Sequence, residues 1–289
     1  MLLLHGAIRY LCYNTGVGTL YLVATPIGNL EDLTLRAKRI LGEVDLIAAE
    51  DTRHTRQLLS RYDIHTSLTS YHEHSKPGKH KKILTALERG DVALVSDAGT
   101  PGLNDPGYPL VCEAIEAGHS VVPIPGPSAP IAALTASGLP TDAFIFFGYV
   151  PRKQSDKVAL FMSLKGERRT AIGFEVPNRL VSTLEGLLDV VGGERQIVLG
   201  RELTKYHEEF LRGPLKEIVT RLRQEGARGE YTMILGGARE TERWTIDEVR
   251  NALTRELEHG ASRTEAAKSI ASISGWSRKE IYNISLEDV

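Results

Sequence analysis

The stretch Ser96-Asp-Ala-Gly-Thr-Pro-Gly-Leu-Asn-Asp-Pro-Gly107 is rich in residues that form turns and let a ligand approach the backbone closely. It follows the apolar run 92–95, which is typical of a buried strand, and precedes a helical pattern over 108–117 that ends at Gly118. The stretch is therefore predicted to be a loop that leaves the carboxyl end of a strand and enters a helix. In open α/β sheets, ligands bind at this position.

The glycines of this loop fit neither of two familiar phosphate-binding patterns, G-x-x-x-x-G-K-[ST] and G-x-G-x-x-G. Asp105 precedes Pro106, so it is compatible with a helix N-cap followed by proline at the first helical position, or with ligand contact. Asp97 directly follows the predicted strand and has no obvious helix start to cap. Its position therefore favours a role in ligand binding.

The same order of strand, unusual loop and helix recurs along the first part of the chain. Each of these segments follows a predicted strand: Thr25-Pro-Ile-Gly28, Glu50-Asp-Thr-Arg-His54, Tyr71-His-Glu-His74, Ser96-Asp-Ala-Gly99 and Pro125-Gly-Pro-Ser-Ala129. Alternating strands and helices with short loops predict a mostly parallel α/β sheet. Because the carboxyl ends of parallel strands meet at one edge, the loops predict a ligand cleft there.

Pattern and composition divide the chain into four parts. These are a loosely ordered extension (residues 1–18), an N-terminal α/β domain (19–126), a second α/β domain (127–240) and a helical extension (241–289). The segment 123–140, rich in proline, alanine, serine and glycine, is predicted to be a hinge. In the last part, two short helical patterns meet at Ser274-Gly275 with helix-turn-helix-like spacing, which fits RNA binding and a simple helical cap equally well.

The composition narrows the class of protein. The 289 residues are 42% hydrophobic and 25% charged, which are ordinary globular values. The net charge of −2 means that a nucleic-acid partner would have to be held by local basic patches. The two cysteines lack metal or redox spacing, so we expect a reduced, cytoplasmic protein. His5 and Arg9 interrupt the apolar run at the start, which is too short for a membrane span.

The segment 71–82 is predicted to be a polar loop. It carries three histidines and the densest basic run of the chain. Its histidines are His72, His74 and His80, and its lysines are Lys76, Lys79, Lys81 and Lys82. The segment has no cysteine and no helical i,i+4 histidine pair, and its lysines would repel a cation, so we predict no metal site. The lysines are compatible with a solvated loop or with an arm that grips RNA phosphates.

Three stretches together resemble the bacterial enzymes that methylate the ribose 2′-oxygen of a cytidine in small-subunit ribosomal RNA, a family within the tetrapyrrole-methylase superfamily. They are the loop 96–107, Ala24-Thr-Pro-Ile-Gly-Asn-Leu30 and Ala49-Glu-Asp-Thr-Arg-His-Thr55. Shorter matches occur at Arg201-Glu-Leu-Thr-Lys205 and Gly229-Glu-Tyr-Thr232. The chain departs mildly from the family pattern at Asn104, where serine is more frequent, and at Tyr149, where phenylalanine is usual.

This resemblance implies two α/β domains with S-adenosylmethionine in the cleft between them, a homodimer, and ribosomal RNA of the small subunit as substrate. It also implies the residues that contact the cofactor: Pro26, Asp97, Ala98, Gly99, Leu103, Ser128, Ala129, Phe174, Leu203 and Thr232. Phe174 and Leu203, taken singly, are also compatible with core positions.

The chemistry of ribose methylation suggests further candidates. A ribose hydroxyl is a weak nucleophile, so a base or a charge that stabilises the alkoxide is useful. The residues that match the family at predicted strand ends are Glu50, Asp51, Arg53, His54 and Lys205. Glu50 or His54 is the candidate proton acceptor, and Arg53 could hold a phosphate or the alkoxide. The same segment also fits Asp51 as a helix cap that pairs with Arg53.

Two other functions stay open on sequence alone. One is a small-molecule methyltransferase of the same superfamily that acts on a tetrapyrrole, and the other is a non-catalytic RNA-binding factor. The basic run and the helical extension argue against the first, because a small substrate needs neither. The intact loop 96–107 argues against the second.

Overall fold

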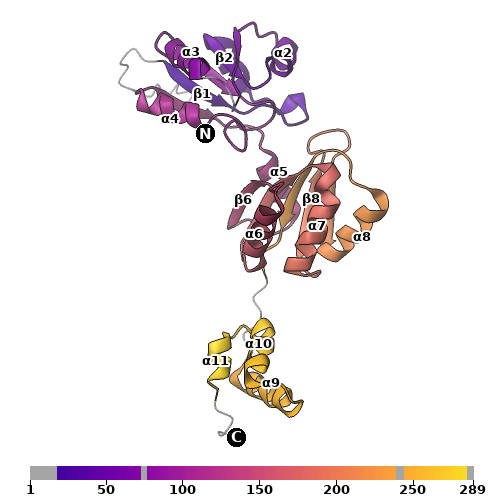
Figure 1. Ribbon diagram of the computed structural model, residues 1–289. Helices are drawn as coiled ribbons and strands as arrows, with labels where there is room; N and C mark the ends of the chain where they lie inside the picture. The colour runs from indigo at the N-terminus through magenta and orange to yellow at the C-terminus, as the bar shows by residue number, and fades with distance from the viewer. Residues whose placement is uncertain (1–17, 73–76, 239–243, 285–289) are drawn as a thin grey trace, which may run out of the picture.

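The first sheet is entirely parallel, where the sequence predicted a mostly parallel one. In the computed structural model, which describes residues 18–72, 77–238 and 244–284, its order is β3-β2-β4-β1-β5. The strands are β1 (Thr19–Val23), β2 (Leu46–Ala49), β3 (Leu68–Ser70), β4 (Val92–Val95) and β5 (Ser120–Ile124). Every residue of β4 is buried, because helices cover both faces of the sheet (Figure 1). The loops at the carboxyl ends therefore share one edge.

The helices of the first unit correct one prediction and exclude one of the two alternatives left open for Asp105. They are the 3-10 helix η1 (Leu30–Asp32) and the α-helices α1 (Leu35–Glu43), α2 (Thr52–Arg61), α3 (Pro77–Leu87) and α4 (Tyr108–Glu116). Since α3 begins at Pro77, the polar loop predicted to reach Lys82 ends earlier. The N-cap of α4 is Gly107, so Asp105 does not cap this helix. The loop makes one more turn before the helix, with Asn104 in the left-handed region at φ 66°.

The second sheet is mixed, with the order β6-β7-β10-β8-β9. Its strands are β6 (Phe144–Tyr149), β7 (Thr170–Glu175), β8 (Gln196–Arg201), β9 (Glu209–Pro214) and β10 (Tyr231–Leu235). Only the pair β6–β7 is parallel. Its helices include α6 (Gln154–Lys165), α7 (Pro177–Val191) and α8 (Leu215–Glu225). Strand β9 was missed from the sequence, because its Gly-Pro ending resembles a loop.

The predicted hinge 123–140 is wrong in its central part, which forms helix α5 (Ala129–Ser137). Pro130 is tolerated because it lies in the first turn, and Gly138 ends the helix in the left-handed conformation. Ala133 and Leu134 are buried against the second sheet. The chain therefore passes from the first sheet to the second through a short segment that leads directly into a packed helix.

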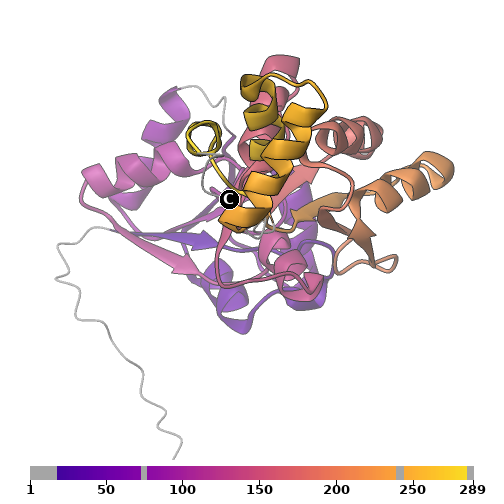
Figure 2. The same cartoon turned by 90° about the horizontal axis from the view of Figure 1, so that it is seen from below.

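Three helices form the C-terminal unit, which lies apart from both sheets in Figure 1 and in front of them in Figure 2. They are α9 (Ile246–Glu258), α10 (Arg263–Ser274) and α11 (Arg278–Tyr282). Each begins with a capping box, and Gly275 ends α10 at φ 71°. The two short helices meet where the sequence predicted them to. Within the described ranges, no helix combines the length and apolar character that a membrane span requires.

Candidate active site

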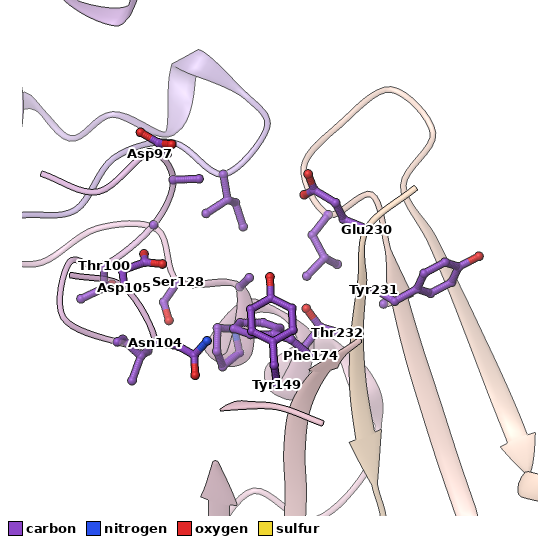
Figure 3. A pocket seen from close by; sticks show the side chains of 18 of the residues that line it. Asp97, Thr100, Asn104, Asp105, Ser128, Tyr149, Phe174, Glu230, Tyr231 and Thr232 are labelled. Atoms are coloured by element: carbon purple, nitrogen blue, oxygen red, sulfur yellow. The ribbon is translucent and has the colours of Figure 1, made fainter. Parts of the chain in front are cut away.

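A cleft of about 380 Å³ lies where the carboxyl edge of the first sheet faces the second sheet. Figure 3 shows Asp97, Thr100, Asn104 and Asp105 on one side, and Phe174, Glu230 and Thr232 on the other. We call these sides the first wall, formed by residues of the first sheet's loops, and the second wall, formed by residues of the second sheet. Ser128 and Ala129, at the start of α5, complete the lining between them.

Backbone hydrogen bonds hold the first wall in place. The N–H of Thr25 donates to the carbonyl of Gly99 at 2.9 Å, and the N–H of Gly99 donates back to Thr25 at the same distance. The hydroxyl of Thr100 donates to the carbonyl of Pro127 at 3.2 Å. Gly99 itself has φ 81°, a conformation that favours glycine. The loop 96–107 is therefore fixed to its neighbours before any ligand binds.

Asp97 joins two loops of the first wall. Its Oδ1 accepts a hydrogen bond from the backbone N–H of Asp51 at 2.9 Å. Its own N–H donates to Oε2 of Glu50 at 3.4 Å. Both Asp97 and Glu50 line the cleft. Asp97 thus has a structural task in addition to the ligand role that its position favoured.

Asp51 and Arg53 adopt the arrangement that the sequence left open as a helix cap. Asp51 is the N-cap of α2 and accepts from the N–H of Arg53 at 2.8 Å. The guanidinium of Arg53 donates to the same carboxylate at 3.2 and 2.8 Å. The side-chain and backbone hydrogen bonds from Arg53 hold the pKa of Asp51 well below its usual range. Asp51 is therefore an anion at neutral pH, and Arg53 is exposed beside it.

The carboxyl group of Asp105 lies where its ionised form is disfavoured. Burial raises the pKa of Asp105 above the usual value, and the nearby Asp97 carboxylate raises it further, while a hydrogen bond from Ser96 opposes the change. Asp105 lines the cleft together with Asp97. A positively charged ligand between these groups would relieve the unfavourable electrostatics.

A β-bulge shapes the second wall. Phe146 of β6 pairs with Ile172 of β7, but the next pair is Tyr149 with Phe174, so β6 contains one extra residue. Gly148 takes φ 72° within this bulge. The rings of Tyr149 and Phe174 lie 5.3 Å apart, and both line the cleft (Figure 3). The bulge thus brings an aromatic pair to the ligand side of the sheet.

The two walls touch at Asn104 and Gly148. A Cβ atom built on Gly148 would lie 2.2 Å from Oδ1 of Asn104, so a side chain there would displace the end of the Asn104 side chain. Glycine at this position therefore lets the loop of the first wall approach the bulge of the second. The mild departure from the family pattern at Asn104 lies in this contact.

A buried carboxylate, that of Glu175, stabilises the second wall through hydrogen bonds. Glu175 ends β7 and is only 2% exposed. It accepts from the Thr183 hydroxyl at 2.7 Å and from the Arg179 guanidinium at 3.0 Å. Arg179 also donates to the carbonyl of Val150 at 2.7 Å. This network anchors the chain that follows Tyr149.

At the rim of the second wall, Lys205 bridges two glutamates. Its Nζ lies 3.0 Å from Oε2 of Glu230 and 3.1 Å from Oε1 of Glu202. Partial burial works against the charge, but the hydrogen bonds to Glu230 and Glu202 prevail and raise the pKa of Lys205. Lys205 is therefore a cation at neutral pH and cannot act as a base. Its Cγ would clash with any side chain at Gly28.

The structure brings most of the expected cofactor residues together. These line the cleft: Asp97, Ala98, Gly99, Leu103, Ser128, Ala129, Phe174, Leu203 and Thr232. Pro26 does not line the cleft. Of the expected catalytic residues, Glu50 lines it, while Asp51, Arg53, His54 and Lys205 lie outside the lining. Leu203, which lines the cleft, is also a core residue and is 7% exposed.

The sequence did not single out several residues of the cleft. Glu175, Gly200 and Glu230 line it and were not among the expected contacts. Glu230 falls in a stretch that resembles the family, which was a usable signal. Glu175 and Gly200 lie in strands whose sequences resemble ordinary core strands, and nothing in the pattern marked them.

The histidines and lysines of the segment 71–82 separate in space. His80 contacts Glu113 at 2.9 Å, and its ring lies 5.2 Å from that of Tyr71. Lys81 and Lys82 are exposed on α3, whereas His74 and Lys76 lie outside the described residues. Among the residues that the structure describes, no group of three or more His, Cys, Asp or Glu side chains is arranged to hold a metal ion.

The fold and cleft define a class of methyltransferases. Residues 19–219 match the family of tetrapyrrole (corrin/porphyrin) methylases. The fold is similar to that of uroporphyrin-III C-methyltransferase from Thermus thermophilus in complex with S-adenosyl homocysteine, with a TM-score of 0.53 and 21% identity. That match covers 76% of this chain and 97% of the other.

Full-length relatives narrow the assignment. Ribosomal RNA small subunit methyltransferase I of Synechocystis is 45% identical, over 94% of this chain and 98% of the relative. The protein of the same name from Halalkalibacterium halodurans is 46% identical, over 92% and 94%. The chain therefore belongs to the tetrapyrrole methylase family and, within it, to the ribosomal RNA small subunit methyltransferase I group.

Proposed function

We propose that this protein transfers a methyl group from S-adenosylmethionine to the ribose 2′-oxygen of a cytidine in small-subunit ribosomal RNA. The observation that carries the proposal is the position of the loop 96–107, which resembles this family most specifically and forms the first wall of the cleft. The kinship with ribosomal RNA small subunit methyltransferase I supports the class of substrate.

The cleft suits the methyl donor. S-adenosylmethionine supplies an electrophilic methyl group on a positively charged sulfur. The carboxyl groups of Asp97 and Asp105 favour a cation, and the backbone at Gly99 allows close approach. Phe174, beside Tyr149, offers an aromatic surface for the adenine. The donor would thus lie between the two walls, with its charged part toward the first.

Positioning supplies much of the rate of such a transfer, because an oriented pair of reactants avoids the entropic cost of meeting. Glu50 is the candidate base, since it is the expected catalytic residue that lines the cleft. Arg53, which is exposed beside Asp51, and the cationic Lys205 would hold RNA phosphate or stabilise developing negative charge.

We also propose how the chain is organised around this reaction. The protein is a cytoplasmic homodimer. Each protomer has two α/β domains, residues 19–126 and 127–240, and binds RNA with residues 241–289. Supporting this role, Lys268, Arg278 and Lys279 are exposed on the C-terminal helices. Lys81 and Lys82 on α3 offer a second basic surface, which lengthens the surface available to ribosomal RNA.

Methyl transfer to isolated small ribosomal subunits tests this function. Subunits from cells that lack the modification are incubated with the protein and labelled S-adenosylmethionine, and the label is counted in the RNA. We expect label in the RNA of the small subunit. Cofactor binding without label in RNA, but with label in added tetrapyrrole, would favour the small-molecule methyltransferase. Absence of cofactor binding, with or without subunits, would favour a non-catalytic RNA-binding factor.

A further inference from the structure

A second, smaller cavity adjoins the cleft and has no assigned ligand. Its volume is about 290 Å³. It shares Ile27 and Ser128 with the cleft, so the two spaces are neighbours. The remaining lining comes from both sheet units and the segment between them: Asp32, Thr34, Gly126, Pro127, Ala132 and Thr204. We call it the side cavity.

Two side chains that line the side cavity each have a buried oxygen atom without a hydrogen-bond partner among the described residues. Oδ2 of Asp32 and Oγ1 of Thr204 are buried, and neither has a hydrogen-bond partner among the described residues. Buried polar atoms are nearly always satisfied in proteins, because an unsatisfied one destabilises the fold. These two atoms belong to residues from distant parts of the chain that both line the side cavity, so a polar ligand bound there is a candidate to complete their hydrogen bonds.

The surroundings hold Thr204 in place. Thr204 has φ 63°, and Glu202, two residues earlier, has φ 50°. Two residues other than glycine therefore adopt the left-handed conformation in one short loop. Oγ1 of Thr204 lies 2.8 Å from where a Cβ of Gly28 would be. The hydroxyl therefore packs closely against Gly28, in the loop that follows β1. Strain of this kind is common at ligand sites.

The chemistry of the two atoms restricts the ligand. A carboxylate oxygen only accepts hydrogen bonds, so the group facing Asp32 must donate. The hydroxyl of Thr204 can donate or accept. A ring that carries an amino group beside a ring nitrogen or carbonyl oxygen matches this pair. Cytosine, adenine and guanine carry such an amino group and uracil does not. Of the pyrimidines only cytosine matches, and aspartate is a known type of acceptor for its N4 amino group.

We propose that the side cavity receives the base of the target nucleotide, and that Asp32 selects cytosine by accepting a hydrogen bond from its amino group. This inference rests on the proposed function and deepens it. The shared residues Ile27 and Ser128 place the base next to the methyl-donor cleft, as a ribose methyltransferase requires. A base that leaves its stack to enter such a cavity is read on its hydrogen-bonding edge.

The test compares cytosine with uracil at the target position. Small subunits are reconstituted from transcripts that carry C or U there, and methyl transfer is measured for the wild type and for Asp32→Asn. We expect the wild type to prefer C by about 10- to 100-fold, as hydrogen-bonded discrimination of bases usually gives. Asp32→Asn should lower this preference below about threefold, because its amide can donate to O4 of uracil.

Matched variants distinguish a loss of base recognition from a loss of folding or of donor binding. Glu31→Gln alters the adjacent exposed carboxylate of η1 and should keep the wild-type preference. Thr204→Val removes the second unpartnered group and should reduce transfer to C and to U alike, because the hydroxyl can donate to N3 of cytosine or accept from N3–H of uracil. The affinity of each variant for S-adenosylmethionine should stay within about twofold of the wild type, since neither group lines the main cleft.

The outcomes are distinct. An unchanged preference in a folded Asp32→Asn variant overturns the inference and leaves the side cavity as a site for ordered water. If Asp32→Asn does not fold, an unchanged rate of transfer to C in Thr204→Val overturns it instead. If the wild type binds the donor but methylates neither subunit, the proposed function fails and the inference fails with it.

Discussion

The two walls of the cleft are built from different kinds of sequence. The first wall consists of loops at the carboxyl edge of a parallel sheet, and its carboxyl groups and backbone are held by hydrogen bonds between loops. The second wall consists of strand ends in a mixed sheet, and it presents an aromatic pair over a buried carboxylate network. We propose that this difference reflects a division of tasks, in which the first wall binds the charged part of the donor and the second binds its flat adenine.

The largest effect is expected from Asp97 in the first wall. Asp97→Ala should lower the affinity for S-adenosylmethionine by about 10- to 100-fold, the scale of a hydrogen bond to a charged group. Asp97→Asn is the matched variant, because its amide oxygen can still accept from the N–H of Asp51. We expect the asparagine variant to unfold at the wild-type temperature and yet bind the donor weakly. Calorimetric titration that finds wild-type affinity for Asp97→Asn would contradict a charge-binding first wall.

The contact between the walls should give the next largest effect. Gly148→Ala places a Cβ against Oδ1 of Asn104 and forces alanine into a left-handed conformation, which costs about 1–2 kcal/mol. We expect a lower melting temperature and a donor affinity reduced by about tenfold, the scale of 1.4 kcal/mol. Adding Asn104→Gly should restore affinity but not stability.

Gly166→Ala is the control for this contact, because its added Cβ has open space and its φ is −99°. It should leave both quantities unchanged. If the double variant binds the donor as poorly as Gly148→Ala alone, the contact between the walls does not control donor affinity.

The second wall should contribute less through any single side chain. Phe174→Leu keeps an apolar group but removes the ring that faces Tyr149. Because aromatic pairing is worth about 0.5–1.5 kcal/mol, the affinity for S-adenosylmethionine should fall about two- to tenfold. The loss should be similar for S-adenosyl homocysteine, since the two share the adenine. A loss confined to S-adenosylmethionine would mean that Phe174 senses the charged sulfur instead.

The smallest effect concerns pH and Asp105. Burial raises the pKa of Asp105, so its ionised form is less favourable in the folded than in the unfolded protein. Asp105→Asn should therefore melt a little higher than the wild type at pH 7. This gain should disappear as the pH falls below the ordinary aspartate value of 3.8, where both states of the wild type are protonated. An asparagine variant that is less stable at pH 7 would contradict this description of Asp105.

The same contrast between the walls explains what the sequence could predict. Loops such as 25–28 and 96–99 carry glycine, proline and aspartate directly after strands, so their common edge followed from the order of elements. Phe174 and Leu203 in the second wall have the composition of core residues. Their exposure to the cleft depends on a bulge and on packing between sheets, which local sequence does not encode.

Other features depended on tertiary contacts that no local pattern shows. Helix α5 was expected to be a hinge because proline and glycine flank it, but burial of Ala133 and Leu134 stabilises it. Asp105 was compatible with a helix cap from the sequence, but the loop makes a further turn and α4 is capped at Gly107. Asp32 and Thr204 meet in one cavity although they lie far apart in the chain. Such pairings arise only when the two sheets are placed together.

The most direct test of ribose methylation is the position of the methyl group within the labelled nucleotide. RNA from small subunits labelled by the protein is hydrolysed in alkali, which cleaves next to free 2′-hydroxyl groups but not next to methylated ones. The account predicts that the label is recovered in an alkali-resistant dinucleotide whose 5′ residue is cytidine. Label recovered in mononucleotides would place the methyl group on a base and contradict it.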